Sequence, residues 1–525
     1  MTALDYIVIA AYLLGMVGMG AWFSRQTSRA DYFLGDRTFG WFPLTLSTMA
    51  TQLSAISFIS APAFVGIREG GGLIWLSYEL AVPLAMIFLM TVLMPGLYRA
   101  GYVSIYEYLE ARFDQSTRFL ISIVFQISRA FGTGVSVYAM ALILREMVGV
   151  SLTMAILLTA VVTAIYSLMG GMKAVVYGDA AQMGLIFLGL VLCIVFGLAA
   201  LGGMDGLAAN VDVARLVAVD FSDSGLTGGE FGFWPMLFGG LVLYVSYYGA
   251  DQTQAQRLLS SSDEGRLRRV LTANGLLRFP MVLLYCFLGL VLGTLAHVSP
   301  DLSAEAIAAD PDTLLPRFIL TFMPAGLVGL LVVAILSATM SSLSSVINSL
   351  TAVTVEDISR FSGGAERQEK HYVKLSRLVA LGWSVIILLF SLYAGNIADT
   401  VIEAINKVGS MFYGPILATF LLALLSRGVR PMAANLGLLA GVGVNMALWL
   451  GAPEVFWFWW NATGLVASLS VSLLAETVRG RIPAFQVPVG ALVEGRANVA
   501  ILLAAFAAIL ATVSGITLAF AGAGP

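Results

Sequence analysis

The segment Ser341-Ser342-Leu343-Ser344-Ser345 lies inside an apolar stretch that runs from Phe318 to Val355. Four hydroxyls in five residues add little hydrophobicity to a stretch long enough to cross a bilayer. A polar group in hydrocarbon without a partner costs roughly several kcal/mol. The serines therefore predict a bound ligand at this depth. The alternative is that each hydroxyl donates to the preceding helical turn, which accounts more readily for one or two serines than for four.

The composition indicates an integral membrane protein. Of the 525 residues, 59% are apolar and only 11% are charged, and the mean hydropathy is +0.90. This is too little charge to cover a soluble surface of that size. The net charge of −3 disfavours nucleic acid as a partner. Cys193 and Cys286 both lie in apolar runs, so we interpret them as packing residues.

Apolar windows long enough to span a bilayer recur along the whole chain and predict fourteen transmembrane helices. With the N-terminus outside, most of the 28 Lys and Arg residues fall in inside loops, as the positive-inside rule requires. Both termini are then outside, and the protein lies in the plasma membrane, a bacterial-type inner membrane. The predicted spans are residues 5–24, 41–66, 73–98, 119–148, 152–170, 178–201, 233–251, 270–296, 316–355, 375–395, 399–426, 431–450, 455–477 and 498–522.

Two of these spans should be interrupted. Leu46 to Pro62 is rich in Ser, Thr, Gln and Ala and ends in proline, and the seventh span has a weak zone from Tyr244 to Gln252. Broken backbone at membrane depth is tolerated where it lines a cavity, and its carbonyls can then bind a cation. Small-residue packing for the first span and an interfacial aromatic cluster for the second are the alternatives.

Interrupted spans five apart in order predict inverted five-helix repeats. No linker or soluble segment divides the chain, so residues 1–525 should form a single transmembrane domain. Its predicted parts are an extra N-terminal helix (5–24), a first repeat (41–201), a second repeat (233–426) and additional C-terminal helices (431–522).

Two polar features carry the site hypothesis. Ala338, Ser341, Ser342 and Ser345 share one helix face and Ser344 lies near its edge, which suits a hard monovalent cation such as sodium. Asp179 begins the sixth predicted span, where it could cap a helix or bind a second cation.

The chain resembles the sodium/solute symporter family, which contains sodium-coupled sugar, sialic acid, monocarboxylate and multivitamin transporters. The resemblance implies an all-α membrane protein with a five-plus-five inverted-repeat core and two broken helices. It is carried by the segments Ala50-Thr-Gln-Leu53, Tyr106-Glu-Tyr-Leu-Glu-Ala-Arg-Phe113, Gly170-Gly-Met-Lys-Ala-Val-Val-Tyr-Gly-Asp179, Tyr248-Gly-Ala-Asp-Gln-Thr-Gln-Ala-Gln-Arg257 and Ser337-Ala-Thr-Met-Ser-Ser-Leu-Ser-Ser-Val-Ile-Asn-Ser349.

The resemblance also implies two sodium sites. The first comprises backbone carbonyls and serine hydroxyls of Ala50, Leu53, Ala338, Ser341 and Ser342. The second comprises Asp179, Ser341, Ser344 and Ser345. No cofactor or metal other than the coupling sodium is expected.

For the substrate, the resemblance implies a set of pocket residues. Glu79 matches a glutamate of the sugar branch, while Ser54 and Ser57 match hydroxyls that meet a carboxylate in the sialic acid branch. Arg129 lies three residues before Gly132, where that branch has its carboxylate-binding arginine. The implied set is Gln52, Ser54, Ser57, Glu79, Arg129, Tyr244, Tyr247 and Asn406.

Charged residues within the spans leave alternatives open. A carboxylate at Glu79 predicts a neutral, hydroxylated substrate, unless Arg129 pairs with it. Glu403 and Lys407 can satisfy each other at helical spacing.

We therefore predict a secondary active symporter that imports a small organic solute by alternating access, with two sodium ions per cycle. A sugar or polyol is the first candidate, and a monocarboxylate, sialic acid or vitamin-like anion is the alternative. A solute sensor on the same fold is a second class, whereas an enzyme is disfavoured because no nucleophile and base pair is evident. The expected partners are the solute, sodium and the lipid bilayer, and the expected functional unit is a monomer.

Overall fold

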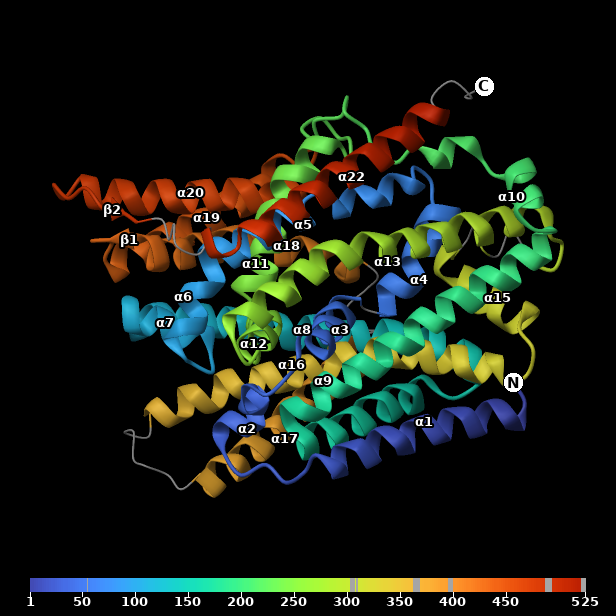
Figure 1. The fold of residues 1–525 in the computed structure, drawn as a ribbon, viewed down its shortest axis with the longest axis horizontal. Coiled ribbons are helices and arrows are strands. Elements are labelled where there is room, and N and C mark those ends of the chain that lie inside the picture. The colour runs from blue at the N-terminus through green and yellow to red at the C-terminus, as the bar shows by residue number, and fades with distance from the viewer. Residues whose placement is uncertain are drawn as a thin grey trace.

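The structure, a computed structural model, is a bundle of long helices. It describes residues 1–520 except 54, 303–306, 308–309, 362–368, 395–399 and 487–492, and it leaves out the side chains of residues 55–56, 359–361, 369–370 and 400–408. Most of the helices run along the long axis of the molecule, and α1 begins and α22 ends near the same end of it (Figure 1).

Helices account for nearly all of the described secondary structure. The long ones are α1 (Ala3–Trp22), α8 (Gln115–Val148), α9 (Leu152–Leu201), α13 (Glu264–Val298), α16 (Leu327–Phe361), α17 (Glu369–Tyr393), α18 (Thr400–Leu425), α19 (Pro431–Gly451), α20 (Phe458–Thr477) and α22 (Arg496–Phe520). The shorter ones are α2 (Arg29–Leu34), α3 (Trp41–Gln52), α4 (Ala55–Gly66), α5 (Val82–Phe88), α6 (Met94–Ala100), α7 (Ile105–Arg112), α10 (Met204–Asn210), α11 (Gly240–Gly249), α12 (Gln252–Leu259) and α15 (Leu314–Phe322).

Short turns and one small sheet complete the fold. The helical turns are η1 (Gly35–Arg37), η2 (Leu73–Glu79), η3 (Leu89–Leu93), η4 (Val213–Leu216), η5 (Pro235–Gly239) and η6 (Pro311–Thr313). The antiparallel strands are β1 (Ser426–Arg427) and β2 (Ala484–Phe485).

Within the described residues, ten helices are long and apolar enough to cross a membrane, or eleven when the bent pair α3 and α4 counts as one span. The predicted number of fourteen is therefore not confirmed. The predicted spans 152–170 and 178–201 fall in one helical run, α9, and the predicted span 233–251 contains only the short elements η5 and α11.

Helix α9 bends where the sequence predicted a loop. Gly171 has φ +53° and ψ −149° inside an otherwise helical run, a conformation that L side chains rarely adopt. A Cβ atom at Gly171 would also lie 2.8 Å from the carbonyl oxygen of Tyr32. Glycine at position 171 therefore permits both the bend in α9 and the close approach of α2, which carries Tyr32.

Both predicted interruptions are present. Trp41–Gln52 and Ser57–Gly66 meet at 61°, and α11 ends at Gly249 before α12 begins at Gln252. Tyr244 and Tyr248 of α11 are buried, so the alternative of an interfacial aromatic cluster is wrong. The other alternative was packing of small residues. Such packing is seen just beyond the first break, where α4 and α13 approach so closely that a Cβ atom at Gly66 would lie 2.5 Å from the carbonyl oxygen of Gly289.

Helix α16, which carries the serine run, lies at the centre of the bundle. It packs against α1, α8, α9 and α17. In its most apolar 18-residue window, 89% of residues are buried inside the protein, against 17% for α22. The serine hydroxyls therefore face protein groups rather than lipid.

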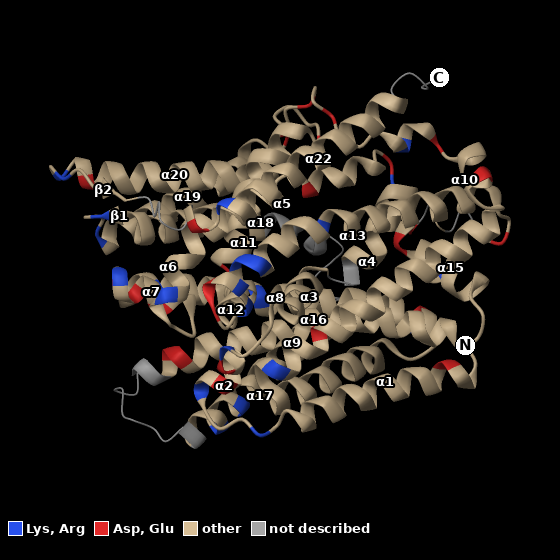
Figure 2. Ribbon diagram, viewed as in Figure 1, with Lys and Arg blue, Asp and Glu red and all other residues tan. Residues whose placement is uncertain are grey.

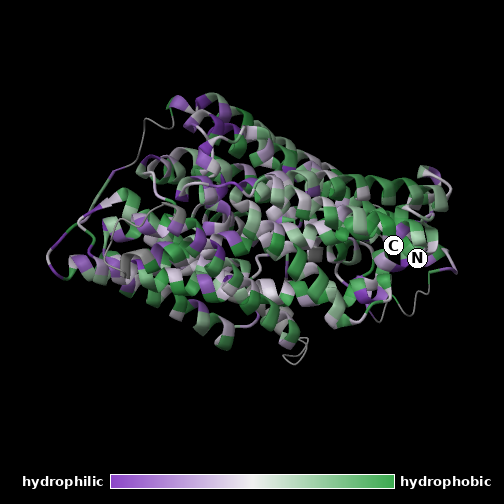
Figure 3. Ribbon diagram, turned by 90° about the horizontal axis from the view of Figure 1, so that it is seen from below, coloured by the Kyte–Doolittle hydropathy of each residue, from purple (hydrophilic) through white to green (hydrophobic). Residues whose placement is uncertain are grey.

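Charge and hydropathy are unevenly distributed along the bundle. Lys and Arg gather at the end that holds α2, α7, β1 and β2, whereas acidic residues predominate near α10 and the N-terminus (Figure 2). Hydrophilic residues gather most densely at the end away from the two termini (Figure 3). This asymmetry fits the predicted orientation, in which the basic end faces the cytoplasm.

Candidate functional site

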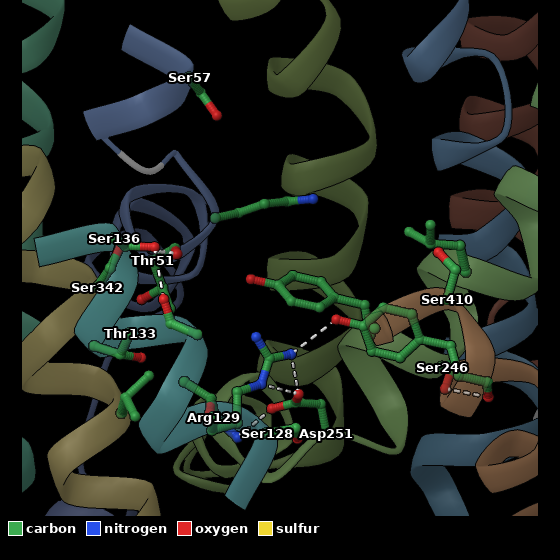
Figure 4. A pocket seen from close by; sticks show the side chains of 18 of the residues that line it. Thr51, Ser57, Ser128, Arg129, Thr133, Ser136, Ser246, Asp251, Ser342 and Ser410 are labelled. Atoms are coloured by element: carbon green, nitrogen blue, oxygen red, sulfur yellow. Dashed lines mark hydrogen bonds and ion pairs between the residues drawn. The ribbon is translucent and has the colours of Figure 1, made fainter. Parts of the chain in front are cut away.

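A cavity of about 530 Å³ lies inside the bundle, and both helix interruptions open onto it. Thr51, Gln52 and Leu53 line it at the end of α3, and Ala250 and Asp251 line it between α11 and α12. Further lining residues come from α4, α8, α13, α16 and α18. Figure 4 shows hydroxyl side chains on opposite sides of the cavity, with Arg129 and Asp251 pointing toward each other.

The serine face of α16 lies against the end of α3. The Ser342 hydroxyl lies 3.4 Å from the carbonyl oxygen of Thr51 and 3.3 Å from that of Ala338. Because α3 stops at Gln52, its last carbonyls have no further helical turn to donate to them. The carbonyl oxygens and the serine hydroxyls predicted for the first sodium site therefore come from elements that are in contact. Thr51, which the sequence analysis did not single out, belongs to the same group.

Asp179 is held by side chains from three other helices. Its carboxylate accepts hydrogen bonds from Ser47 Oγ (2.6 Å), Ser341 Oγ (2.7 Å), Arg257 Nη2 (2.9 Å) and Thr51 Oγ1 (3.4 Å). The residue lies inside α9, beyond the bend at Gly171, so the alternative of a helix cap is wrong. Asp179, Ser341 and Ser345 of the predicted second sodium site are thus brought together.

Arg257, to which the sequence analysis assigned no role, lies in the middle of this group. Its Nε donates to Ser47 Oγ at 2.8 Å, its Nη1 donates to the Thr253 carbonyl at 2.5 Å, and its Nη2 donates to both Asp179 and Ser345 Oγ. The side chains of Arg257 and Asp179 are 2% and 1% exposed. A buried aspartate within the membrane requires a cation, and that requirement was the signal available in the sequence.

Each serine of the run has a protein partner. Ser344 and Ser345 donate to the Ser341 carbonyl at 3.1 and 2.6 Å, Ser342 approaches the Ala338 carbonyl, and Ser341 donates to Asp179. Back-bonding therefore accounts for three of the four hydroxyls, one more than expected, but not for Ser341, which donates to Asp179. Three of them donate to the preceding turn, and only their convergence with Asp179 and the end of α3 still points to a cation.

Two arginine–carboxylate pairs line the cavity, and neither is the pair Glu79–Arg129 considered from the sequence. Glu79 accepts from Arg278 Nε at 2.5 Å and from Arg278 Nη2 at 3.0 Å. Arg129 donates from Nε to Asp251 Oδ2 at 2.6 Å and from Nη2 to the same oxygen. The Tyr413 hydroxyl also accepts from Arg129 Nη2, at 3.0 Å.

Of the other predicted substrate residues that the structure describes, some line the cavity and one does not. Gln52, Ser57 and Tyr247 line the cavity with Glu79 and Arg129. Tyr244 does not line it, and its ring instead lies 5.1 Å from the guanidinium of Arg278.

Some predictions fall outside what the structure describes, and some lining residues were missed. Ser54 and the side chains of Glu403, Asn406 and Lys407 lie outside the described residues. Asp251, Arg278 and Tyr413 are lining residues that the sequence analysis missed.

Comparisons with known proteins identify the family. Residues 32–441 match the model of the sodium:solute symporter family. The chain is 31% identical to sodium-coupled monocarboxylate transporter 2 of Danio rerio, over 85% of this chain and 71% of that protein. It is also 31% identical to the sodium-dependent multivitamin transporter of Oryctolagus cuniculus, over 86% of this chain and 70% of that protein.

A solved structure shares the fold. A Na+-coupled sialic acid symporter, in a substrate-bound outward-open state with a novel Na+ site, superimposes with a TM-score of 0.83 at 24% identity, over 92% of this chain and 99% of the other. A nucleobase-cation-symport-1 family transporter matches with a TM-score of 0.52 at 14% identity, over 86% and 95%. With its several apolar helices, this chain is a multi-pass membrane protein that couples transport to sodium, and it is not an enzyme. The resemblance read from its motifs is confirmed: the chain belongs to the sodium:solute symporter family.

Proposed function

We propose that the protein imports a small organic anion, of the monocarboxylate class, together with sodium by alternating access. One observation carries the choice of an anion: both carboxylates among the described lining residues, Glu79 and Asp251, are already engaged. Arg278 occupies both oxygens of Glu79. Asp251 accepts the Thr253 amide on one oxygen and Arg129 on the other.

The guanidinium groups, in contrast, keep donors in reserve. Among the described residues, Nη1 of Arg129 and Nη1 of Arg278 make no hydrogen bond to protein. Arginine presents five N–H donors in a fork that matches a carboxylate. The prediction of a sugar or polyol assumed a free carboxylate at Glu79, and its pairing with Arg278 removes that reason.

The remainder of the cavity suits a small solute with an apolar part. Phe125, Val137, Val282 and Leu343 contribute apolar surface beside the hydroxyls. A volume of about 530 Å³ lies within the usual range for small-molecule sites. The names of the relatives, monocarboxylate and multivitamin transporters, also favour organic acids.

Sodium would bind in the two sites that the sequence implied. The first uses carbonyls of Ala50, Leu53 and Ala338 with hydroxyls of Ser341 and Ser342, and the second is centred on Asp179. Leu53 and Ser342 also line the cavity, so sodium at the first site would fix the wall that meets the solute. By linkage, sodium then raises solute affinity, and solute raises sodium affinity by the same factor.

The membrane arrangement completes the proposal. The basic end of the bundle would face the cytoplasm, and both termini would lie outside. The transporting unit would be a monomer, because the cavity and both sodium sites are lined within one chain.

Uptake into proteoliposomes tests this function. A labelled monocarboxylate should accumulate under an inward sodium gradient and not under a potassium gradient. Ser341→Ala and Ser342→Ala should each raise the sodium concentration for half-maximal uptake by about tenfold, which corresponds to roughly 1.4 kcal/mol. Ser349→Ala is the matched control, because Ser349 is buried on the same helix and its partners among the described residues are Thr253 and Val346. An unchanged sodium dependence in both site variants contradicts the assignment of the first site.

A further inference from the structure

Arg257 lies where the proposed second sodium ion would bind. Its Nη2 contacts Asp179 and Ser345, two of the four residues of that site, and a third, Ser341, donates to the other Asp179 oxygen. We propose that Arg257 and the second sodium ion compete for Asp179, so that sodium binds there only when the guanidinium has moved away. The inference rests on the proposed function and explains what sets the sodium affinity of this site.

Charge balance is the first reason for competition. The described partners of Arg257 and Asp179, other than each other, are neutral: Ser47, Thr51, Ser341, Ser345 and the carbonyl of Thr253. One carboxylate therefore balances one cation. Both side chains are buried, so a sodium ion added beside the guanidinium would leave a net positive charge out of contact with water. A single cation at a time is the favourable state.

Shared oxygens are the second reason. Asp179 Oδ2 accepts from Arg257 and Ser47, and the Ser345 hydroxyl accepts from Arg257. Sodium needs the lone pairs of these same oxygens. Departure of the guanidinium would free Oδ2 of Asp179 and Oγ of Ser345 together, which are a charged and a neutral ligand from two helices.

One hydrogen bond of the guanidinium is made to its own helix. Its Nη1 donates to the carbonyl of Thr253, four residues earlier in α12, and this bond does not involve Asp179. The residue that precedes α12 is Asp251, which holds Arg129 in the cavity. The exchange of cations at Asp179 thus occurs on the helix that begins at the substrate cavity.

Sodium-dependent melting of purified protein tests the competition without any substrate. Arg257→Gln should melt lower than wild type in potassium, because Asp179 loses its cation. Sodium should then raise its melting temperature by more than it raises that of wild type, and the half-saturating sodium concentration should fall about tenfold or more. A sodium response equal to or weaker than that of wild type overturns the proposal.

Two further variants make the test decisive. Arg257→Gln combined with Asp179→Asn removes both charges, so it should fold and lose the additional sodium response; a retained response overturns the proposal. Arg257→Lys keeps the charge but loses the planar fork, and its half-saturating sodium concentration should fall by less than that of Arg257→Gln. If Arg257→Gln cannot be purified, an Arg257→Lys protein with wild-type sodium dependence contradicts the competition.

Two different results distinguish the competition at Asp179 from sodium-driven uptake itself. Absence of sodium-driven uptake in the wild-type protein defeats the proposed function. Sodium-driven uptake in wild type, combined with an unchanged sodium response in the Arg257 variants, defeats only the competition.

Discussion

The two arginine–carboxylate pairs at either end of α12 differ in how completely they are enclosed. Arg257 makes hydrogen bonds from Nε, Nη1 and Nη2, and its side chain is 2% exposed. Arg129 makes them from Nε and Nη2, lines the cavity, and has a side chain that is 24% exposed. We therefore expect the enclosed pair to exchange one cation for another and the open pair to offer donors to an anion.

This difference has energetic consequences. A charge left behind in an enclosed pair has no water to solvate it, so breaking that pair is expensive. A charge left behind in the open pair can be solvated by water or solute in the cavity. Substitutions at the enclosed pair should therefore change stability first, and substitutions at the open pair should change transport first.

The largest effect is expected for Asp179→Asn. The substitution leaves the Arg257 guanidinium buried without a counter-charge, which costs about 3–5 kcal/mol in comparable buried pairs. Thermal unfolding in detergent measures this loss. The double variant Asp179→Asn/Arg257→Gln should recover most of it, and a single variant as stable as wild type would show that Asp179 is not charge-balanced by Arg257.

The next effect is expected for Arg129→Gln. Arg129 would be the charged partner of the solute carboxylate. Its removal should lower kcat/KM for anion uptake roughly 30-fold or more, which corresponds to about 2 kcal/mol. Its unfolding temperature should change less than that of Asp179→Asn. Anion uptake with wild-type kinetics would exclude Arg129 from the substrate site.

A smaller effect is expected for Tyr413→Phe. The hydroxyl accepts one hydrogen bond from Arg129 Nη2, and such a bond is worth about 1 kcal/mol. The variant should raise KM for the anion a few-fold and leave the sodium dependence unchanged. A change in sodium dependence alone would place Tyr413 with the sodium sites instead.

The smallest effect is expected at an exposed pair. Arg99 donates to Glu264 from Nε at 2.6 Å, but its side chain is 59% exposed. Surface pairs contribute less than about 1 kcal/mol because water and salt screen them. Arg99→Ala should therefore leave both uptake and stability close to wild type, and a large loss would mean that exposure is not what separates these pairs.

Local sequence features predicted the elements that rest on local chemistry. The polar composition around Ala50 and the weak zone near Asp251 marked both helix interruptions, and helical spacing placed Ser341 and Ser342 on one face. These features depend on residues within a few turns of each other. They are therefore visible in one segment of sequence.

The partners of the charged residues were not predictable in the same way. Glu79 and Arg278 are 199 residues apart, and Arg129 and Asp251 are 122 residues apart. Only packing decides which of several intramembrane charges meet. Residues 171–177 were likewise placed in a loop between two predicted spans. In the structure Lys173 pairs with Asp31 at 2.6 Å, and α9 continues through the bend at Gly171.

Uptake of a carboxylate and its amide tests sodium-driven anion import most directly. Proteoliposomes that contain potassium would receive labelled butyrate with and without external sodium, and unlabelled butyramide, an uncharged molecule of nearly the same shape, would serve as competitor. We predict that butyrate accumulates only with sodium and that butyramide does not compete. Sodium-driven accumulation of a labelled sugar or polyol, with no sodium-dependent butyrate uptake, would contradict it.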